Sequence, residues 1–403
     1  MSTRTHRRVR VTVAAAVAAL ACSAAVVSHR ASDALAELRD RGRLLGTRHA
    51  ATLAPRPAIW GDTAAGSAFE HYERAAKLAE PFDDRDDVRP LLELDDPAIA
   101  CERSRDAWLP IVDALRAGAR CADHRFPRAD RRFGCANLLT YRRAANLTLL
   151  EARARRAEGR NVDAAHLTLD VMAMGAACVQ DGVLINQMVG AALVSIAVDA
   201  WPDDALRAAG VEALQALRDG LARVDARLPA TLDLDAELRE MADALLAVPD
   251  QEDWCGVGSW RYGFSTRWMV ADAFLAMADG AERMRSCRGA PWPTRQAAFA
   301  AEIDRLRAMD NSAALVIAPN LESCELQLRW NLANLRLLRL AVQLHLREPF
   351  TLPDPLGEGS LAVTPRDDDF ELSSAGNDAR DRLRRLARPE PQSTGARTSF
   401  TKR

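Results

Sequence analysis

Apolar residues recur at helical spacing along most of this chain. Leu35, Leu38, Leu44 and Leu45 predict one short helix between Ser32 and Gly46. The same three- and four-residue spacing predicts helices over 63–80, 97–119, 136–158, 162–180, 183–201, 202–223, 232–246, 264–284, 293–309 and 321–346. We therefore expect a mainly α fold, an array of about ten antiparallel helices arranged as αα-hairpins in a solenoid or a bundle.

The clearest hairpin joins 136–158 to 162–180. Gly159 stands where a helix C-terminus needs a left-handed residue, and Asn161 is positioned to cap the next helix. The following segment, 183–201, is mostly apolar, so a second membrane span is one interpretation of it. Asn186, Gln187 and Asp199 favour instead a helix buried at the centre of the helical domain.

The chain begins with basic residues followed by an apolar run from Val11 to Val27. This pattern is typical of an export signal or a membrane anchor, and its charge bias places the body outside the cytoplasm. Three fates are open: an uncleaved anchor, a cleaved signal peptide after Ala19-Leu20-Ala21, or a lipoprotein acylated at Cys22. We expect a bacterial envelope protein, held in the inner membrane with its body in the periplasm or outside, with a lipoprotein as the alternative.

The hydrophobic pattern and composition divide the chain into five parts. They are a signal anchor or signal peptide at 1–30, a juxtamembrane helix and connector at 31–62, the helical domain at 63–348, a small β-hairpin region at 349–378, and a tail at 379–403 that we expect to be disordered. The expected hairpin consists of strands at 360–364 and 369–374 around a polar turn.

Composition excludes some partners. The net charge of −2 over 403 residues gives no basic surface for nucleic acid, so we expect none to bind. Only Lys77 and Lys402 are lysines among the 54 basic residues, which we interpret as the bias of a GC-rich genome rather than as a functional use of arginine.

In an oxidising compartment the cysteines become disulfide candidates. Cys121 and Cys135 flank a loop that is short enough to close at little entropic cost, so this pair is the first candidate and Cys255–Cys287 the second. Cys178 lies in an apolar run and is expected to stay a free, buried thiol.

No catalytic, zinc-binding or phosphate-binding motif occurs in the sequence, and we expect no cofactor and no metal. One local feature stands out: Trp254, Trp260, Tyr262 and Trp268 lie within fifteen residues in a chain poor in aromatics. They could form a stacking surface for a sugar or a peptide, or they could pin the loop to the helical core.

The C-terminal region resembles the end of the major pseudopilin of type II secretion systems. The resemblance lies in Asp354-Pro-Leu-Gly357, the strand Ser360-Leu-Ala-Val363, and Phe370-Glu-Leu-Ser-Ser-Ala-Gly376-Asn-Asp378. It implies a calcium loop that would map onto Asn377, Asp378 and Asp381. A prepilin-peptidase site is absent from the N-terminus, and Arg380 and Arg382 stand where those proteins usually have glycines.

The whole layout is similar to that of uncharacterised bacterial envelope proteins with an N-terminal anchor and an Ala/Leu-rich helical body. The segment 152–172 also resembles a single tetratricopeptide-type hairpin. We therefore expect a non-enzymatic, envelope-anchored scaffold that binds another protein, such as an accessory to secretion or envelope assembly. The alternative is an envelope enzyme that acts on glycans or peptides through the loop 254–268.

Overall fold

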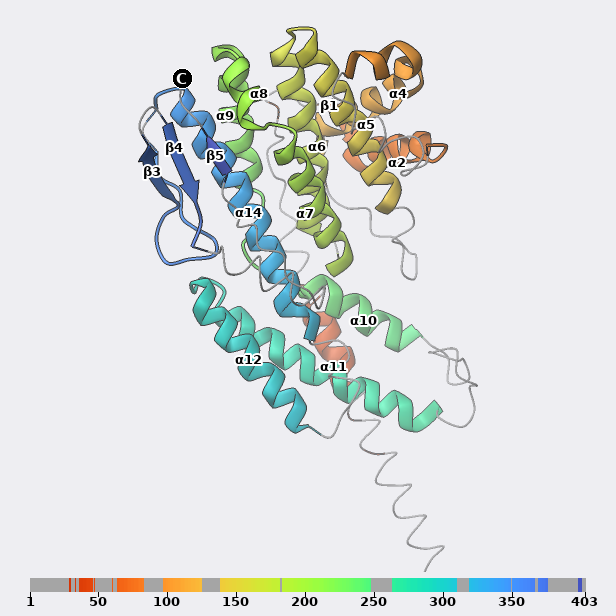
Figure 1. Ribbon diagram of the computed structural model, residues 1–403. Helices are drawn as coiled ribbons and strands as arrows, with labels where there is room; N and C mark the ends of the chain where they lie inside the picture. The colour runs from red at the N-terminus through yellow and green to blue at the C-terminus, as the bar shows by residue number, and fades with distance from the viewer. Residues whose placement is uncertain are drawn as a thin grey trace, which may run out of the picture.

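The computed structural model describes residues 29, 33, 36–45, 47, 60, 64–82, 97–124, 138–181, 183–247, 263–309, 319–348, 350–366, 369–375 and 398–400. Within these residues the protein is mainly helical and carries a small antiparallel sheet near the C-terminus (Figure 1). The predicted membrane segment, 11–27, lies outside the described residues.

The larger group of helices, which we call the body, packs around one continuous hydrophobic core. It consists of α2 (Ala68–Ala79), α4 (Pro97–Ala119), α5 (Leu138–Ala157), α6 (Asn161–Asp181), α7 (Leu184–Asp199), α8 (Asp203–Ala208) and α9 (Val211–Asp225). From α2 to α7 each helix contacts the next one along the chain, and α9 packs on α6.

A second group, which we call the base, lies below the body in Figure 1. It consists of α10 (Asp235–Ala247), α11 (Gly263–Ser286), α12 (Trp292–Ala308) and the helical residues 36–45. The long helix α14 (Pro319–His345) joins the two groups (Figure 1). Leu326 near its start packs with Trp292 and Phe299 of α12, whereas Leu335 and Leu338 belong to the core of the body.

Helix α6 is the central helix of the body. Among the described residues it is the one helix long and apolar enough to cross a membrane, but 83% of its most apolar window is buried inside the protein. Helix α7 packs closely against it, with Gly175 of α6 facing Gly190 of α7. The apolar segment predicted at 183–201 is thus a helix packed against α6 and α14.

Two polar groups of α7, the Gln187 amide and the Leu184 N–H, have partners outside their own helix. The buried amide of Gln187 donates to the carbonyl of Asp233 at 2.6 Å and accepts from the Asp233 N–H at 3.2 Å. Glu237 of α10 accepts a hydrogen bond from the backbone N–H of Leu184, which is an otherwise unsatisfied donor at the start of α7. These contacts attach the body to the base.

The C-terminal sheet has the order β3–β4–β5 and packs beside α14 (Figure 1). Strand β3 (Ala362–Arg366) pairs antiparallel with β4 (Asp369–Ser373), as the predicted hairpin requires. Strand β5 (Thr398–Phe400) pairs with the other edge of β4 and comes from the segment for which the sequence predicts disorder. The sheet therefore has three strands where two were predicted.

Two local predictions differ from the structure. The helix predicted over 202–223 is two helices, α8 and α9, because Gly210 between them has φ +76°, outside the helical region. The helix predicted from Thr63 begins at Ala68, and Ala64–Ser67 form the strand β1, in which Gly66 has φ +117°. Strand β1 pairs in parallel with β2 (Cys121–Asp123), which follows α4.

Candidate functional site

The most unusual side chain of the body is Asp170, a carboxylic acid in the middle of the central helix α6. It is completely buried, and its sequence neighbours Leu169 and Val171 are buried apolar residues. Its Oδ1 accepts a hydrogen bond of 2.7 Å from the indole Nε1 of Trp60. Its Oδ2 accepts no hydrogen bond from the described residues, and Nε of Arg116 lies 3.6 Å from it.

Trp60 makes three distinct contacts around this acid. Besides the hydrogen bond to Asp170, its ring meets the imidazole of His166 edge-on, with 4.8 Å between centroids. The guanidinium carbon of Arg120 lies 5.8 Å from the centre of the indole. We call Asp170, His166 and Arg120 the Trp60 seat. His166 lies one helical turn before Asp170 on α6, and Arg120 follows the last turn of α4.

Burial dominates the electrostatics of the seat. It raises the pKa of Asp170 from 3.8 to about 7, although Arg116, Arg120 and the Trp60 N–H all act to lower it. Burial also lowers the pKa of His166, and the charges of Arg120 and Arg116 lower it further. At neutral pH a large share of Asp170 is therefore protonated while His166 is neutral.

Tyr72 of α2 lies in the same region of the core. Its hydroxyl is buried and makes no hydrogen bond with the described residues. Burial and then the charge of Asp170 raise the pKa of this phenol well above its ordinary value. The ring of His124, 6.3 Å from that of Tyr72, has its pKa lowered to about 4 by burial and then by Arg227. Tyr72 and His124 are therefore both neutral at neutral pH.

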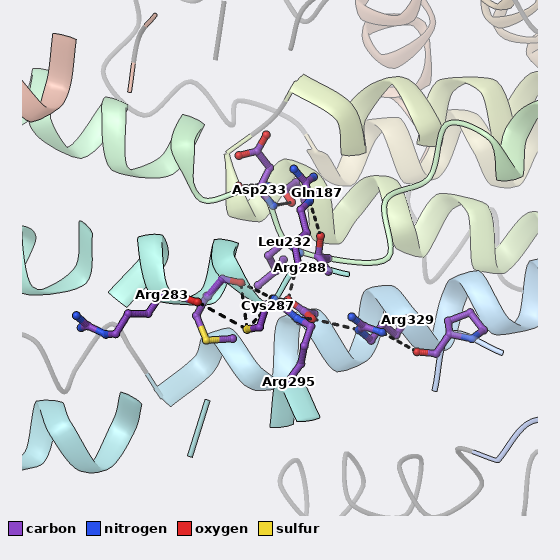
Figure 2. A network of polar contacts seen from close by, with 12 residues as sticks. Gln187, Leu232, Asp233, Arg283, Cys287, Arg288, Arg295 and Arg329 are labelled. Carbon is purple, nitrogen blue, oxygen red and sulfur yellow. Dashed lines mark hydrogen bonds and ion pairs between the residues drawn. The ribbon is translucent and has the colours of Figure 1, made fainter. Parts of the chain in front are cut away.

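A second polar cluster joins the base to α14 and is drawn in Figure 2. Its centre is Glu325 of α14, which is fully buried and receives both prongs of the Arg295 guanidinium from α12. Arg329, one turn along α14, donates to the same carboxylate at 3.1 Å and to the carbonyl of Pro355 at 2.8 Å. Arg295 also donates to the carbonyl of Met284 at 2.6 Å, so the cluster holds α11, α12, α14 and the Pro355 turn together.

The same arrangement, one carboxylate between two arginines, recurs at other helix contacts. Asp225 of α9 accepts from Arg336 and Arg339 of α14. Glu151 of α5 accepts from Arg105 of α4 and from Arg155. Burial raises the pKa of Glu151, but the hydrogen bonds from Arg105, Arg155 and Trp108 outweigh it and leave the pKa below its ordinary value. Glu151 is therefore ionised at neutral pH, and all three carboxylates join helices.

The aromatic residues that the sequence singled out are only partly covered by the structure. Trp254, Trp260 and Tyr262 lie outside the described residues, and Trp268 belongs to α11. The stacking surface therefore stays a prediction, and so does lipidation at Cys22, which also lies outside the described part of the chain.

No disulfide joins any two of Cys121, Cys178, Cys287 and Cys324, the cysteines whose side chains the structure describes. The proposed partners Cys135 and Cys255 lie outside this part of the chain, so both predicted pairs stay predictions. Cys178 is fully buried, as expected from its apolar surroundings, and burial raises the pKa of its thiol to about 12.

The two halves of the pseudopilin-like pattern meet in the structure. Oδ1 of Asp354 accepts hydrogen bonds from the Leu356 N–H at 2.9 Å and the Ser374 hydroxyl at 2.7 Å. Its Oδ2 accepts from the N–H of Ala375 at 2.7 Å, so this buried acid ties the Asp-Pro-Leu-Gly turn to the end of β4. The predicted calcium ligands Asn377, Asp378 and Asp381 lie outside the described residues.

Sequence reasoning missed the Trp60 seat. Trp60 belongs to the connector, 110 positions before Asp170, and no short motif links the two. Asp170, in the middle of the mostly apolar run 164–179, was the available signal, because a charged residue there needs a partner or a proton.

Comparison with known proteins gives no relative. No protein-family model, no curated protein and no solved structure matches this chain. Within the described residues, no group of three or more His, Cys, Asp or Glu side chains is placed to hold a metal ion.

Proposed function

We propose that this protein is a helical scaffold of the bacterial cell envelope that binds another protein rather than catalysing a reaction. One observation carries the proposal: the buried carboxyl groups of Glu151, Asp225 and Glu325 each accept hydrogen bonds from two arginines. A catalytic acid or base must reach a substrate with at least one free position. These carboxylates instead accept hydrogen bonds from arginines, and each of them thereby joins two helices.

The arrangement of the body supports a binding role. Helices α5 and α7 each pair with α6 through a short turn, so both run in the same direction. Each exposes a large apolar side chain in its first turn: Leu139 is 65% exposed and Ile185 is 49% exposed. Apolar side chains at one end of a helical array are suited to contact a partner protein.

We further propose that the N-terminal apolar segment holds the body at the membrane. Its length suits a short spanning helix, and the basic residues before it favour an N-terminus in the cytoplasm. The body would then lie in the periplasm or outside, with acylation at Cys22 as the alternative means of attachment. A role as an accessory to secretion or envelope assembly belongs to this proposal.

Site-specific photocrosslinking in intact bacteria tests the binding role. A photoreactive amino acid replaces Leu139 or Ile185 in the full-length chain, and a third version carries it at Asp304, an exposed residue of α12. We expect one discrete protein adduct from 139 and 185 that is absent from 304. Absence of a protein adduct from 139 and 185, or the same adducts from all three positions, would contradict the proposed surface.

The enzyme alternative makes a different prediction. Purified full-length chain would bind glycan, and Trp260→Ala with Trp268→Ala would abolish that binding while the far-ultraviolet circular dichroism stayed unchanged. Under the scaffold proposal, neither the wild type nor the double variant retains glycan.

A further inference from the structure

Several buried polar atoms around Asp170 make no hydrogen bond with the described residues. They are Oδ2 of Asp170 on α6, the hydroxyl of Tyr72 on α2, and Nε of Arg120, which follows α4. Asp170 and Tyr72 are both completely buried. Because buried polar groups in folded proteins are nearly always hydrogen-bonded, these atoms require a partner that the neighbouring side chains do not supply.

The last turns of α4 contact both Tyr72 and Asp170. Nε of Arg116 lies 3.6 Å from Oδ2 of Asp170, which is too long for a hydrogen bond. Two residues further along, a Cβ on Gly118 would lie 2.5 Å from Cε1 of Tyr72, so the phenol ring packs directly on α4. Asp170 is also the charged group that acts most strongly on the Tyr72 hydroxyl. The two unpartnered oxygens therefore belong to one region of the core.

The chemistry of these atoms suits water. A carboxyl oxygen accepts, a phenol hydroxyl both donates and accepts, and Nε of an arginine donates. Water can bond to Asp170 in either protonation state, because it donates to the ionised acid and accepts from the protonated one. Internal waters typically make about three hydrogen bonds to groups that lack other partners.

Other ligands fit this region less well. Asp170 and Tyr72 have no exposed surface through which a larger molecule could reach them. A metal ion is not favoured either, because the described residues include no group of three or more His, Cys, Asp or Glu side chains placed to hold one.

We propose that the Tyr72 hydroxyl and Oδ2 of Asp170 form an internal water-binding site, in which bound water joins α2 to α6 and accepts a hydrogen bond from Nε of Arg120. Trp60 donates to Oδ1 of the same carboxyl, so Oδ2 is the oxygen left for the water. The site goes beyond the scaffold role, because its ligand is solvent held inside the body rather than a partner protein.

Hydroxyl-radical labelling by X-rays tests for the bound water, because X-rays split it and the radicals oxidise the nearest side chains. The full-length chain in mild detergent is exposed for timed intervals, and peptide mass spectrometry follows oxidation of Tyr72 and Phe274. Each rate is divided by its value in the chain unfolded in urea, which removes the intrinsic reactivity of the residue. Phe274 of α11 is the matched control, since it is equally buried and packs among apolar side chains.

We expect the normalised oxidation rate of Tyr72 to be several-fold higher than that of Phe274. Equal protection of the two residues would overturn the water site, including the case in which the hydroxyl bonds directly to Asp170.

Tyr72→Phe gives a second measurement, because it removes the hydroxyl and keeps the ring. If the hydroxyl binds water, the variant loses a hydrogen bond, and its Tm should fall by a few degrees while the far-ultraviolet circular dichroism stays unchanged. A hydroxyl buried without a partner destabilises the folded chain, so its removal would raise the Tm. A Tm equal to or above that of the wild type would therefore overturn the proposal.

Discussion

Gly175 of α6 and Gly190 of α7 face each other where these two helices pack, and a Cβ on Gly175 would lie 2.7 Å from the carbonyl oxygen of Gly190. The same Cβ would lie 2.9 Å from a methyl group of Val194. Real Cβ atoms do not approach backbone this closely, so the two glycines set the separation of the central hairpin.

Gly175→Ala and Gly190→Ala should each destabilise the protein by about 1–3 kcal/mol, because the added methyl forces α6 and α7 apart. Chemical denaturation followed by circular dichroism gives the free energy of unfolding. Gly289→Ala is the matched control, since its Cβ would meet nothing within 4 Å, and it should change the stability little. Equal effects of all three substitutions would show that the close packing of α6 on α7 is not required.

The second prediction concerns the Glu325 cluster in Figure 2. Arg295→Ala leaves the buried Glu325 with one of its two arginines and should cost about 3–5 kcal/mol. Arg295→Lys should also destabilise the protein, because an ammonium group cannot supply the paired donors of a guanidinium. Arg307→Ala removes an exposed ion pair with Asp304 and should cost no more than about 1 kcal/mol. The assignment fails if Arg295→Lys is as stable as the wild type in thermal denaturation.

Thiol reactivity should follow burial. In the reduced native chain at pH 8, iodoacetamide should modify the half-buried Cys287 well before Cys178, whose thiol is fully buried and has its pKa raised to about 12. Peptide mass spectrometry at timed intervals measures both sites. In urea the two should react at similar rates, and similar rates in the native chain would contradict the burial of Cys178.

Because of His124, the free energy of unfolding should decrease when the pH falls below about 6.5. Its pKa is about 4 in the folded chain and 6.5 without burial, so the unfolded chain binds the proton more tightly. Stability is therefore lost as pH falls from about 6.5 toward 4, by about 2 kcal/mol at pH 5 for this one group. His124→Gln should lose less stability than the wild type between pH 7 and pH 5. Parallel losses in urea denaturation would show that His124 does not titrate as described.

The periodic part of the fold could be predicted from the sequence. The predicted and observed bounds agree within a few residues for α4, α5, α6, α7 and α14, because each is a long segment with clear spacing and Gly or Pro at its ends. The sequence did not predict the short strands β1, β2 and β5, because three- or four-residue strands depend on distant pairing partners rather than on their own pattern.

The site was less accessible to prediction, for a physical reason. The hydrogen bond between Trp60 and Asp170 depends on a contact between the connector and α6. Sequence periodicity carries no information on such long-range contacts. We interpret the abundance of arginine as genomic bias, and some of these arginines also supply two donors from one guanidinium to Glu325 and to Glu151. A lysine in those positions could not donate from two nitrogen atoms to the two oxygens of one carboxylate.

The most direct test of the account is the pH dependence of thermal stability in Asp170→Asn. The pKa of Asp170 is about 7 when folded and near 3.8 when unfolded, so its contribution to stability is complete below pH 4 and is lost as pH rises to about 7. Relative to Asp170→Asn, the Tm of the wild type should therefore fall by a few degrees between pH 5.5 and pH 8. A wild-type Tm that rises relative to the variant over this range would mean that Asp170 is a charged partner of Arg116, and it would contradict a buried, proton-binding acid beneath Trp60.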